Sequence, residues 1–131
     1  MTPQELIETF ELVDSWEDRY QFIIDLGKKL PSMPEELKVD SNRVLGCQSQ
    51  VWIFAKPSAG TIHFYADSDA HIVRGLIAIV MIAFQDKTPE DILSFDIDAL
   101  FNKIELHQHL SSGRGNGLKE MVKRVQSLAR D

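Results

Sequence analysis

Residues 50–66, QVWIFAKPSAGTIHFYA, decide the fold of this chain. The run 50–55 is rich in β-branched and aromatic side chains, which suit a half-buried strand. Within residues 61–66, Ile62, Phe64 and Ala66 would lie on one face of a strand and His63 and Tyr65 on the other, as is typical of a strand that packs one face on a core. The residues between the two runs contain the proline and glycine of a turn. The stretch therefore predicts an antiparallel hairpin, and we expect a short third strand around Val44 or Leu45 to join it.

An apolar helix is predicted directly after this hairpin, over Ala70–Asp86. Residues 67–69, Asp-Ser-Asp, precede it and are candidate N-caps. The run Leu76–Phe84 has no polar side chain, but it is much shorter than the roughly 20 residues that a membrane span needs. We therefore expect a central core helix. Gly75 costs roughly 1 kcal/mol relative to alanine inside a helix, so we expect a close backbone contact there, with the sheet.

Longer helices are also predicted at both ends of the chain. Thr2 and Glu5 match a capping box at the start of the first helix. Ser15 begins a second helix, which ends near Pro31. Apolar side chains recur at helical spacing over Leu118–Ala129 and predict the last helix.

The remaining segments complete a single α+β domain over residues 1–131, a usual domain length. Short helices are expected from Thr88 to about Leu93 and around 97–104. Residues 111–117 are predicted as a glycine-rich loop, without the Lys-Ser/Thr that ends a phosphate-binding loop. The expected fold is a small antiparallel sheet of about three strands packed against helices.

Composition limits the classes of function. The formal net charge is −6 and no basic cluster is interleaved with aromatic residues, so nucleic acid is not an expected partner. One cysteine can form neither an internal disulfide nor a thiolate ligand set, and we expect no cofactor and no metal. His107 and His109 are too weak a zinc signal. No signal peptide is visible, so we expect a cytoplasmic protein that is not bound to a membrane.

Cys47, the only cysteine, is the candidate reactive residue. A free cysteine is often just a small buried hydrophobic residue. Here Gly46 precedes it and allows a sharp turn or a positive φ, and three polar residues follow it. These neighbours favour a thiol that is presented on a loop.

The run GCQSQVW, residues 46–52, resembles the signature of the SufE family, the sulfur-acceptor proteins that serve cysteine desulfurases. The resemblance extends from about Trp16 to the C-terminus, in the family's order and spacing. Its other segments are DSDA at 67–70 leading into IVRGLIA at 72–78, TPEDI at 88–92, QHL at 108–110, and Arg114 through Leu118.

This resemblance implies a SufE/IscU-like fold and a sulfur carrier for iron–sulfur cluster assembly. Cys47 would accept persulfide sulfur from a pyridoxal-phosphate-dependent, SufS/CsdA-like cysteine desulfurase, stimulate it, and pass the sulfur to a SufBCD-type scaffold. The resemblance also implies a sheltered pocket for Cys47 and a loop that moves outward on docking, with Gly46 as the candidate pivot. The identity of the desulfurase, the final acceptor and the oligomeric state, including a homodimer, stay open.

Arg114 lies in the segment that resembles the family's arginine-containing loop. Two roles stay open for it: its charge can support a thiolate or persulfide at Cys47, or it can order the loop through hydrogen bonds to carbonyls. Ser112-Gly113 stands where the family usually has a Pro-Ser pair. The resemblance also places Asp67 and Asp69 near the cysteine loop, although helix capping is the default role of such residues.

Two other functions stay open. A stand-alone thiol enzyme would use Cys47 as its nucleophile and pair it with a base, usually histidine, but no histidine lies near Cys47 in the sequence. An adaptor would stimulate a desulfurase by docking alone, without carrying sulfur.

Overall fold

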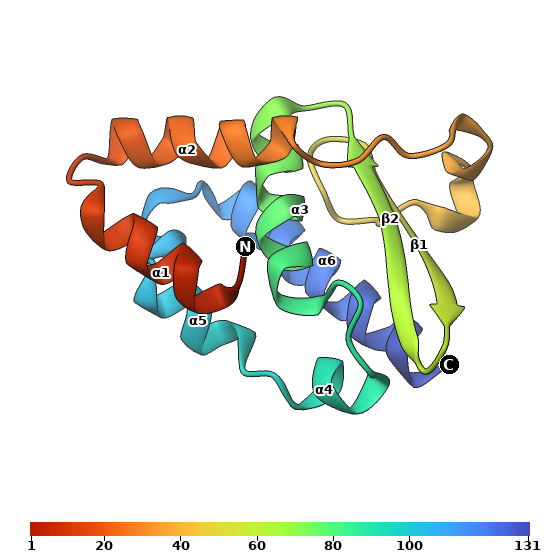
Figure 1. The fold of residues 1–131 in the computed structure, drawn as a ribbon. Coiled ribbons are helices and arrows are strands. Elements are labelled where there is room, and N and C mark those ends of the chain that lie inside the picture. Colours follow the sequence, from red (N-terminus) through yellow and green to blue (C-terminus); the bar gives the residue numbers. More distant parts are fainter.

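The computed structural model describes residues 1–131 and shows six α-helices and one two-stranded antiparallel sheet (Figure 1). Strands β1 (Val51–Ser58) and β2 (Thr61–Ser68) pair along their whole length, from Val51 opposite Ser68 to Ser58 opposite Thr61. The α+β fold and the hairpin are therefore confirmed.

The expected third strand is reduced to a single bridge between Arg43 and Trp52. The backbone N–H of Val44 donates to the carbonyl of Val51 at 2.8 Å. Pairing stops there because Gly46, at φ +89°, turns the chain into the loop that carries Cys47. The sheet therefore has two strands and not three.

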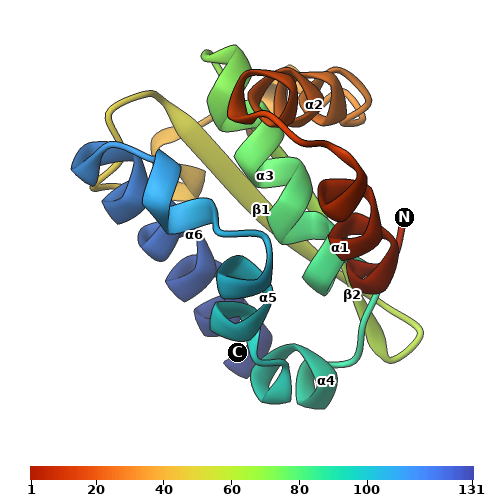
Figure 2. The same ribbon diagram turned by 90° about the vertical axis from the view of Figure 1, so that its left-hand side faces the viewer.

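Helix α3 (His71–Phe84) is the centre of the fold, with all but three of its 14 residues buried. Figure 2 shows α3 in front of the hairpin, with α2 (Trp16–Lys28) across one end and α6 (Ser112–Arg130) alongside. Side chains from the hairpin, α3 and α6 form one core, including Phe64, Leu76 and Met121. The predicted core helix is confirmed. No helix combines the length and the apolar character that a bilayer span requires.

The start of α3 differs from the expected cap. Its N-cap is Ala70, with no side-chain hydrogen bond to the helix. Asp67 and Asp69 do not cap it, because Asp67 pairs with cations of other segments and Asp69 accepts a hydrogen bond from Gln50. The hydroxyl of Ser68 accepts a 3.3 Å hydrogen bond from the N–H of Ala70, which precedes the helix, so Ser68 does not cap α3 either.

Gly75 does make a close backbone contact, but with α2 and not with the sheet. A Cβ at Gly75 would collide with the carbonyl of Ile23. A Cβ at Gly27 would lie 2.6 Å from the backbone nitrogen of Gly75. Two glycines therefore let α2 and α3 cross at backbone contact. A glycine inside a helix indicates a close neighbour but not which neighbour, and the sequence left that choice unresolved.

The predicted capped helices are present. In α1 (Pro3–Leu12) the N–H of Glu5 donates to Thr2 Oγ1 at 3.1 Å, and the Thr2 N–H donates to Glu5 Oε1 at 3.0 Å. Ser15 caps α2 through the N–H of Asp18. The remaining short elements are α4 (Pro89–Ser94), α5 (Ile97–Lys103) and the 3-10 turns η1 (Glu35–Leu37), η2 (Asp40–Asn42) and η3 (Leu106–His109).

The predicted glycine-rich loop at 111–117 is wrong, because these residues begin α6. Ser111 is the N-cap, and its Oγ accepts from the N–H of Arg114 at 3.3 Å. The glycines have a packing reason. A Cβ at Gly113 would overlap the side-chain amide of Gln48. Glycine at these positions lowers the helix propensity, but it allows another segment of the chain to lie against the helix.

Candidate functional site

That segment is the Cys47 loop, defined here as residues 43–50, and both of its ends are fastened by side chains. At the first end, Arg124 of α6 donates from Nη2 to the carbonyl of Arg43 at 2.6 Å. At the other end, Asp69 Oδ1 accepts from the N–H of Gln50 at 3.1 Å. The loop is therefore tied to α6 at its start and to the β2–α3 connection at its end.

The middle of the loop lies on the glycines of α6. The Sγ of Cys47 donates to the carbonyl of Gly117 at 3.6 Å. A Cβ at Gly117 would lie 3.3 Å from that sulfur and 3.5 Å from the Cα of Cys47. Cys47 is half-buried in this position. The thiol is therefore presented on a loop, as predicted, but with its sulfur turned toward the helix.

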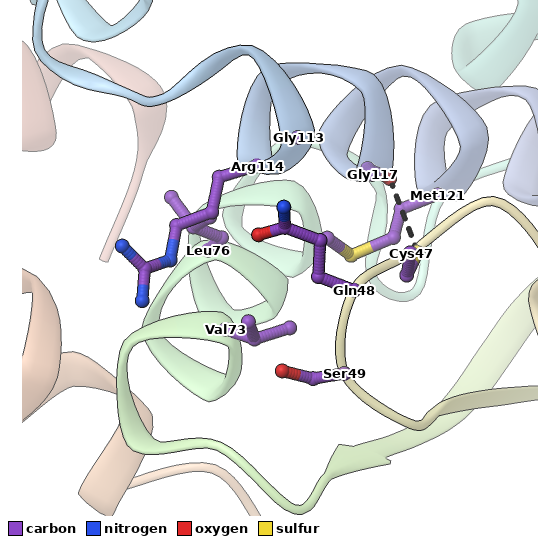
Figure 3. Close-up of a pocket in the computed structure, with 9 residues that line it drawn as sticks. All are labelled: Cys47, Gln48, Ser49, Val73, Leu76, Gly113, Arg114, Gly117 and Met121. Carbon is purple, nitrogen blue, oxygen red and sulfur yellow. Dashed lines mark hydrogen bonds between the residues drawn. The ribbon is translucent and has the colours of Figure 1, made fainter.

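A cavity of about 40 Å³ adjoins the thiol. A cavity needs roughly 10–15 Å³ of such volume to hold one water molecule, so a group the size of one additional sulfur atom fits. Figure 3 shows how the loop, α3 and α6 surround it. It is lined by Cys47, Gln48, Ser49, Val73, Leu76, Gly113, Arg114, Gly117 and Met121.

The surroundings keep Cys47 neutral. Burial raises the pKa of the Cys47 thiol, and the nearby Glu120 carboxylate raises it further. The thiolate is the form that acts as a nucleophile and is readily oxidised. In this conformation the thiolate form of Cys47 is therefore disfavoured.

Gly46 has the positive φ that its position before Cys47 suggested, at +89°. A Cβ there would lie 3.0 Å from Cγ of Glu120. The conformation and the space at this position both favour glycine.

Arg114 lines the same cavity, but its guanidinium points away from Cys47 (Figure 3). That guanidinium makes no hydrogen bond and no ion pair. The structure therefore brings Cys47 and Arg114 to one cavity, but the hydrogen-bond partner of the thiol is Gly117 and not Arg114.

Sequence reasoning missed Glu120 and Arg124. Neither is part of the apolar pattern that predicts the last helix, so the sequence alone did not mark them as site residues. Only the packing of the Cys47 loop on α6 makes them part of the site. No signal in the sequence alone could have found this contact, because Arg43 and Arg124 are 81 positions apart.

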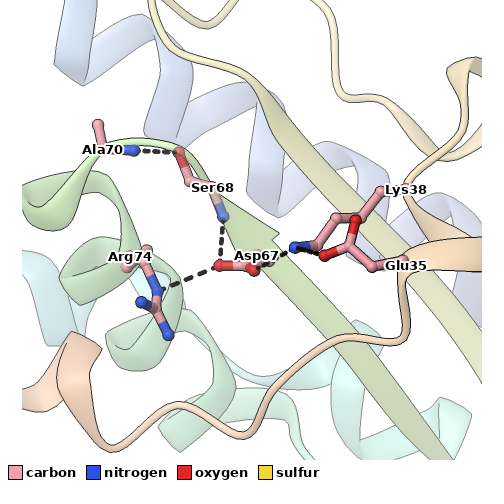
Figure 4. A network of polar contacts seen from close by, with 6 residues as sticks. All are labelled: Glu35, Lys38, Asp67, Ser68, Ala70 and Arg74. Carbon is pink, nitrogen blue, oxygen red and sulfur yellow. Dashed lines mark hydrogen bonds and ion pairs between the residues drawn. The ribbon is translucent and has the colours of Figure 1, made fainter.

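A polar network holds the β2–α3 connection from which Asp69 reaches the loop (Figure 4). Asp67 lies 3.1 Å from Nε of Arg74 and 3.0 Å from Nζ of Lys38, which also contacts Glu35 at 3.0 Å. Hydrogen bonds to Glu35 and Asp67 raise the pKa of Lys38. Arg74 Nε is buried and forms only an ion pair, without a well-directed hydrogen bond.

The four histidines lie elsewhere. His109 stacks on Trp16 with 3.6 Å between ring centroids, and His107 packs edge-on against Phe101. His63 contacts Asp86 at 2.8 Å. None of the four lines the cavity beside Cys47.

Comparison with known proteins finds relatives over nearly the whole chain. The family model for SufE, described as an Fe-S metabolism associated domain, matches residues 4–129. An uncharacterised SufE-like protein of Rhizobium etli is 45% identical over 130 residues, which is 96% of this chain and 88% of that protein. Another, from Rhizobium meliloti strain 1021, is 45% identical over 129 residues, 95% of this chain and 92% of that protein.

The solution structure of a hypothetical protein from Thermus thermophilus has the same fold, with a TM-score of 0.79. The match covers 99% of this chain and 96% of that one, at 22% sequence identity. Because the family model spans nearly all residues and the two relatives are similar over their length, this chain belongs to the SufE family.

Proposed function

We propose that this protein carries sulfur on Cys47, taking it from the persulfide of a SufS-like cysteine desulfurase and passing it to a SufBCD-type scaffold. Family membership supports a role in iron–sulfur metabolism and sulfur transfer, and SufE domains are associated with cysteine desulfurases. The observation that carries the proposal is the only thiol of the chain, placed on a loop beside a cavity of about 40 Å³.

The transfer is a relative of thiol–disulfide exchange. The Cys47 thiolate attacks the outer sulfur of the partner's persulfide and forms a new S–S bond. The S–S bond of the partner breaks, and the partner's cysteine leaves as a thiolate with the electron pair. No oxidant or reductant is consumed. A single cysteine suits this step, because a second thiol could displace the carried sulfur and close an internal disulfide.

The conformation described here is the sheltered state of the carrier. The sulfur of Cys47 faces α6, and its raised pKa disfavours the attacking thiolate. We propose that docking moves the loop outward, with Gly46 as the pivot, and that the hydrogen bonds from Arg124 and to Asp69 are broken or rearranged in that step. After transfer, return to the cavity would protect the persulfide from oxidation.

Arg114 is proposed to act on the loaded carrier. Its unpaired guanidinium lies at the far end of the cavity from Cys47, and we propose that it turns toward the persulfide anion once sulfur is bound. A nearby cation favours an anionic sulfur. In the unloaded state described here, Cys47 draws no such support from it.

The test is intact-mass spectrometry under non-reducing conditions, after the protein has reacted with a SufS-type desulfurase and cysteine. We expect one added sulfur atom on the wild-type protein and none on Cys47→Ser. Absence of added sulfur with an active desulfurase, across several desulfurases, would refute the carrier function.

The same variant tests the adaptor alternative, and an assay without a partner protein tests the thiol enzyme. An adaptor that acts by docking alone would still stimulate the desulfurase as Cys47→Ser, whereas a carrier would lose the stimulation. A stand-alone thiol enzyme would turn over a substrate without a partner protein. The cavity offers that enzyme no histidine to pair with the thiol.

A further inference from the structure

Glu120 packs directly on the Cys47 loop. Its Cγ and Cδ would lie 3.0 Å and 3.6 Å from a Cβ on Gly46, so the side chain covers the residue that precedes the cysteine. Glu120 stands three positions after Gly117, whose carbonyl accepts the hydrogen bond from the thiol. Residues three apart lie on the same face of a helix. The carboxylate and the thiol thus share one face of α6.

The other charged groups around Cys47 are already engaged or directed elsewhere. Lys123 Nζ lies 3.4 Å from Glu120 Oε1 but is largely exposed, so it offsets the carboxylate only in part. Arg124 is used by the carbonyl of Arg43. Arg114 points away from the thiol (Figure 3).

The wall that α3 contributes is uncharged, and the one carboxylate near it is already hydrogen-bonded. Helix α3 contributes only Val73 and Leu76 to the cavity, and Asp69 accepts the N–H of Gln50 at the end of the loop. Glu120 is therefore the charged group whose field acts most directly on Cys47, in agreement with its part in raising the pKa of that thiol.

We propose that Glu120 is a restraining residue: its carboxylate, held against Gly46, adds to burial in opposing ionisation of the Cys47 thiol while the loop is docked on α6. Outward movement of the loop separates the thiol from both Glu120 and the cavity. Formation of the thiolate is then coupled to release of the loop, so Cys47 becomes nucleophilic when the partner protein has docked. This role deepens the proposed sulfur transfer and rests on it for its biological purpose.

The test measures the rate of Cys47 alkylation by iodoacetamide against pH in the isolated protein. Alkylation follows the thiolate fraction. Glu120→Gln removes the charge and keeps the length of the side chain over Gly46. We expect the midpoint of the profile to move to lower pH and the rate below the midpoint to rise about two- to fivefold, the range given by partly exposed charge pairs. The plateau at high pH should not change.

Two matched variants and one condition separate charge from structure. Lys123→Gln removes the cation beside Glu120, so alkylation below the midpoint should become slower than in the wild type. Glu11→Gln makes the same change of net charge on α1, away from the site, and should have no effect. Added salt should narrow the difference between wild type and Glu120→Gln, because it screens exposed charges.

An unchanged midpoint in Glu120→Gln would overturn the proposal. A rate that rises equally at every pH, plateau included, would also overturn it, because that result indicates a loosened loop. The measurement needs no desulfurase. Failure here would leave the persulfide assay intact, and failure of the persulfide assay would leave the charge effect on Cys47 measurable.

Discussion

Replacing Gly117 by alanine tests whether the glycines at the start of α6 exist to seat the Cys47 loop. Alanine is better than glycine inside a helix by about 1 kcal/mol, so helix propensity alone predicts a more stable protein. The new Cβ would lie 3.3 Å from Sγ of Cys47 and 3.5 Å from its Cα. The loop would have to retreat by a few tenths of an ångström, and overpacking of this kind costs about 1–3 kcal/mol.

Gly115 provides the matched control. It lies in the same turn of α6, and a Cβ there meets nothing within 4 Å. Gly115→Ala should therefore show the propensity gain alone, about 1 kcal/mol. Gly117→Ala should be less stable than Gly115→Ala by about 1–3 kcal/mol. It should also be alkylated faster at Cys47, because displacement of the loop reduces the burial that raises the thiol's pKa.

The assay is urea unfolding for the free energy and iodoacetamide alkylation for the thiol, on wild type and both variants. Equal stabilisation by the two substitutions, with the same alkylation rate as wild type, would refute the argument. Gly117 would then have no role in packing, and the position of the loop would not depend on close approach to the helix.

Three further outcomes follow from the structure. Gly75→Ala should lower the free energy of unfolding by about 1–3 kcal/mol in urea titration, because its Cβ meets the backbone of α2 and neither helix can yield cheaply. Arg114→Gln should leave the alkylation rate of the unloaded protein unchanged, and a slower rate would show that the guanidinium acts on the thiol. The third outcome concerns pH. The pKa of Cys47 is raised in the folded state from the 9.0 of a free thiol, so the neutral thiol contributes its full share of stability below that pH. This share is lost as the pH rises from about 9.0 through the folded pKa. Wild type should lose stability relative to Cys47→Ser in that alkaline range, and parallel curves would contradict this.

The parts of the fold that local sequence predicts are those with a clear periodicity or a complete capping motif. The side chains of residues 61–66 alternate between the two faces of a strand, α3 is apolar for nine residues, and the capping box of Thr2 and Glu5 starts α1. Each of these signals lies within a few positions of the element it specifies. The third strand had no such signal, and the turn at Gly46 ends the pairing after one bridge.

The capping expectation for residues 67–69 was wrong for a different reason. Aspartate before a helix is a good cap only when nothing else competes for its carboxylate. Here Arg74 and Lys38 take Asp67, and the N–H of Gln50 takes Asp69. Tertiary partners therefore outweigh a local preference whose size is about 1 kcal/mol.

The same reasoning explains why the candidate site could be found but not assembled from the sequence. Cys47 and Gly46 stand out locally, whereas the surface that receives them does not. That surface is one face of α6, at Gly113, Gly117, Glu120 and Arg124, spaced as a buried face would be. Hydrophobic patterning detects such a face only when apolar side chains fill it. Here two positions are empty of side chains and two are charged, because the face holds the backbone of a polar loop close to the helix. A face that receives a polar loop thus looks, in the sequence, like a loop followed by solvent-exposed helix.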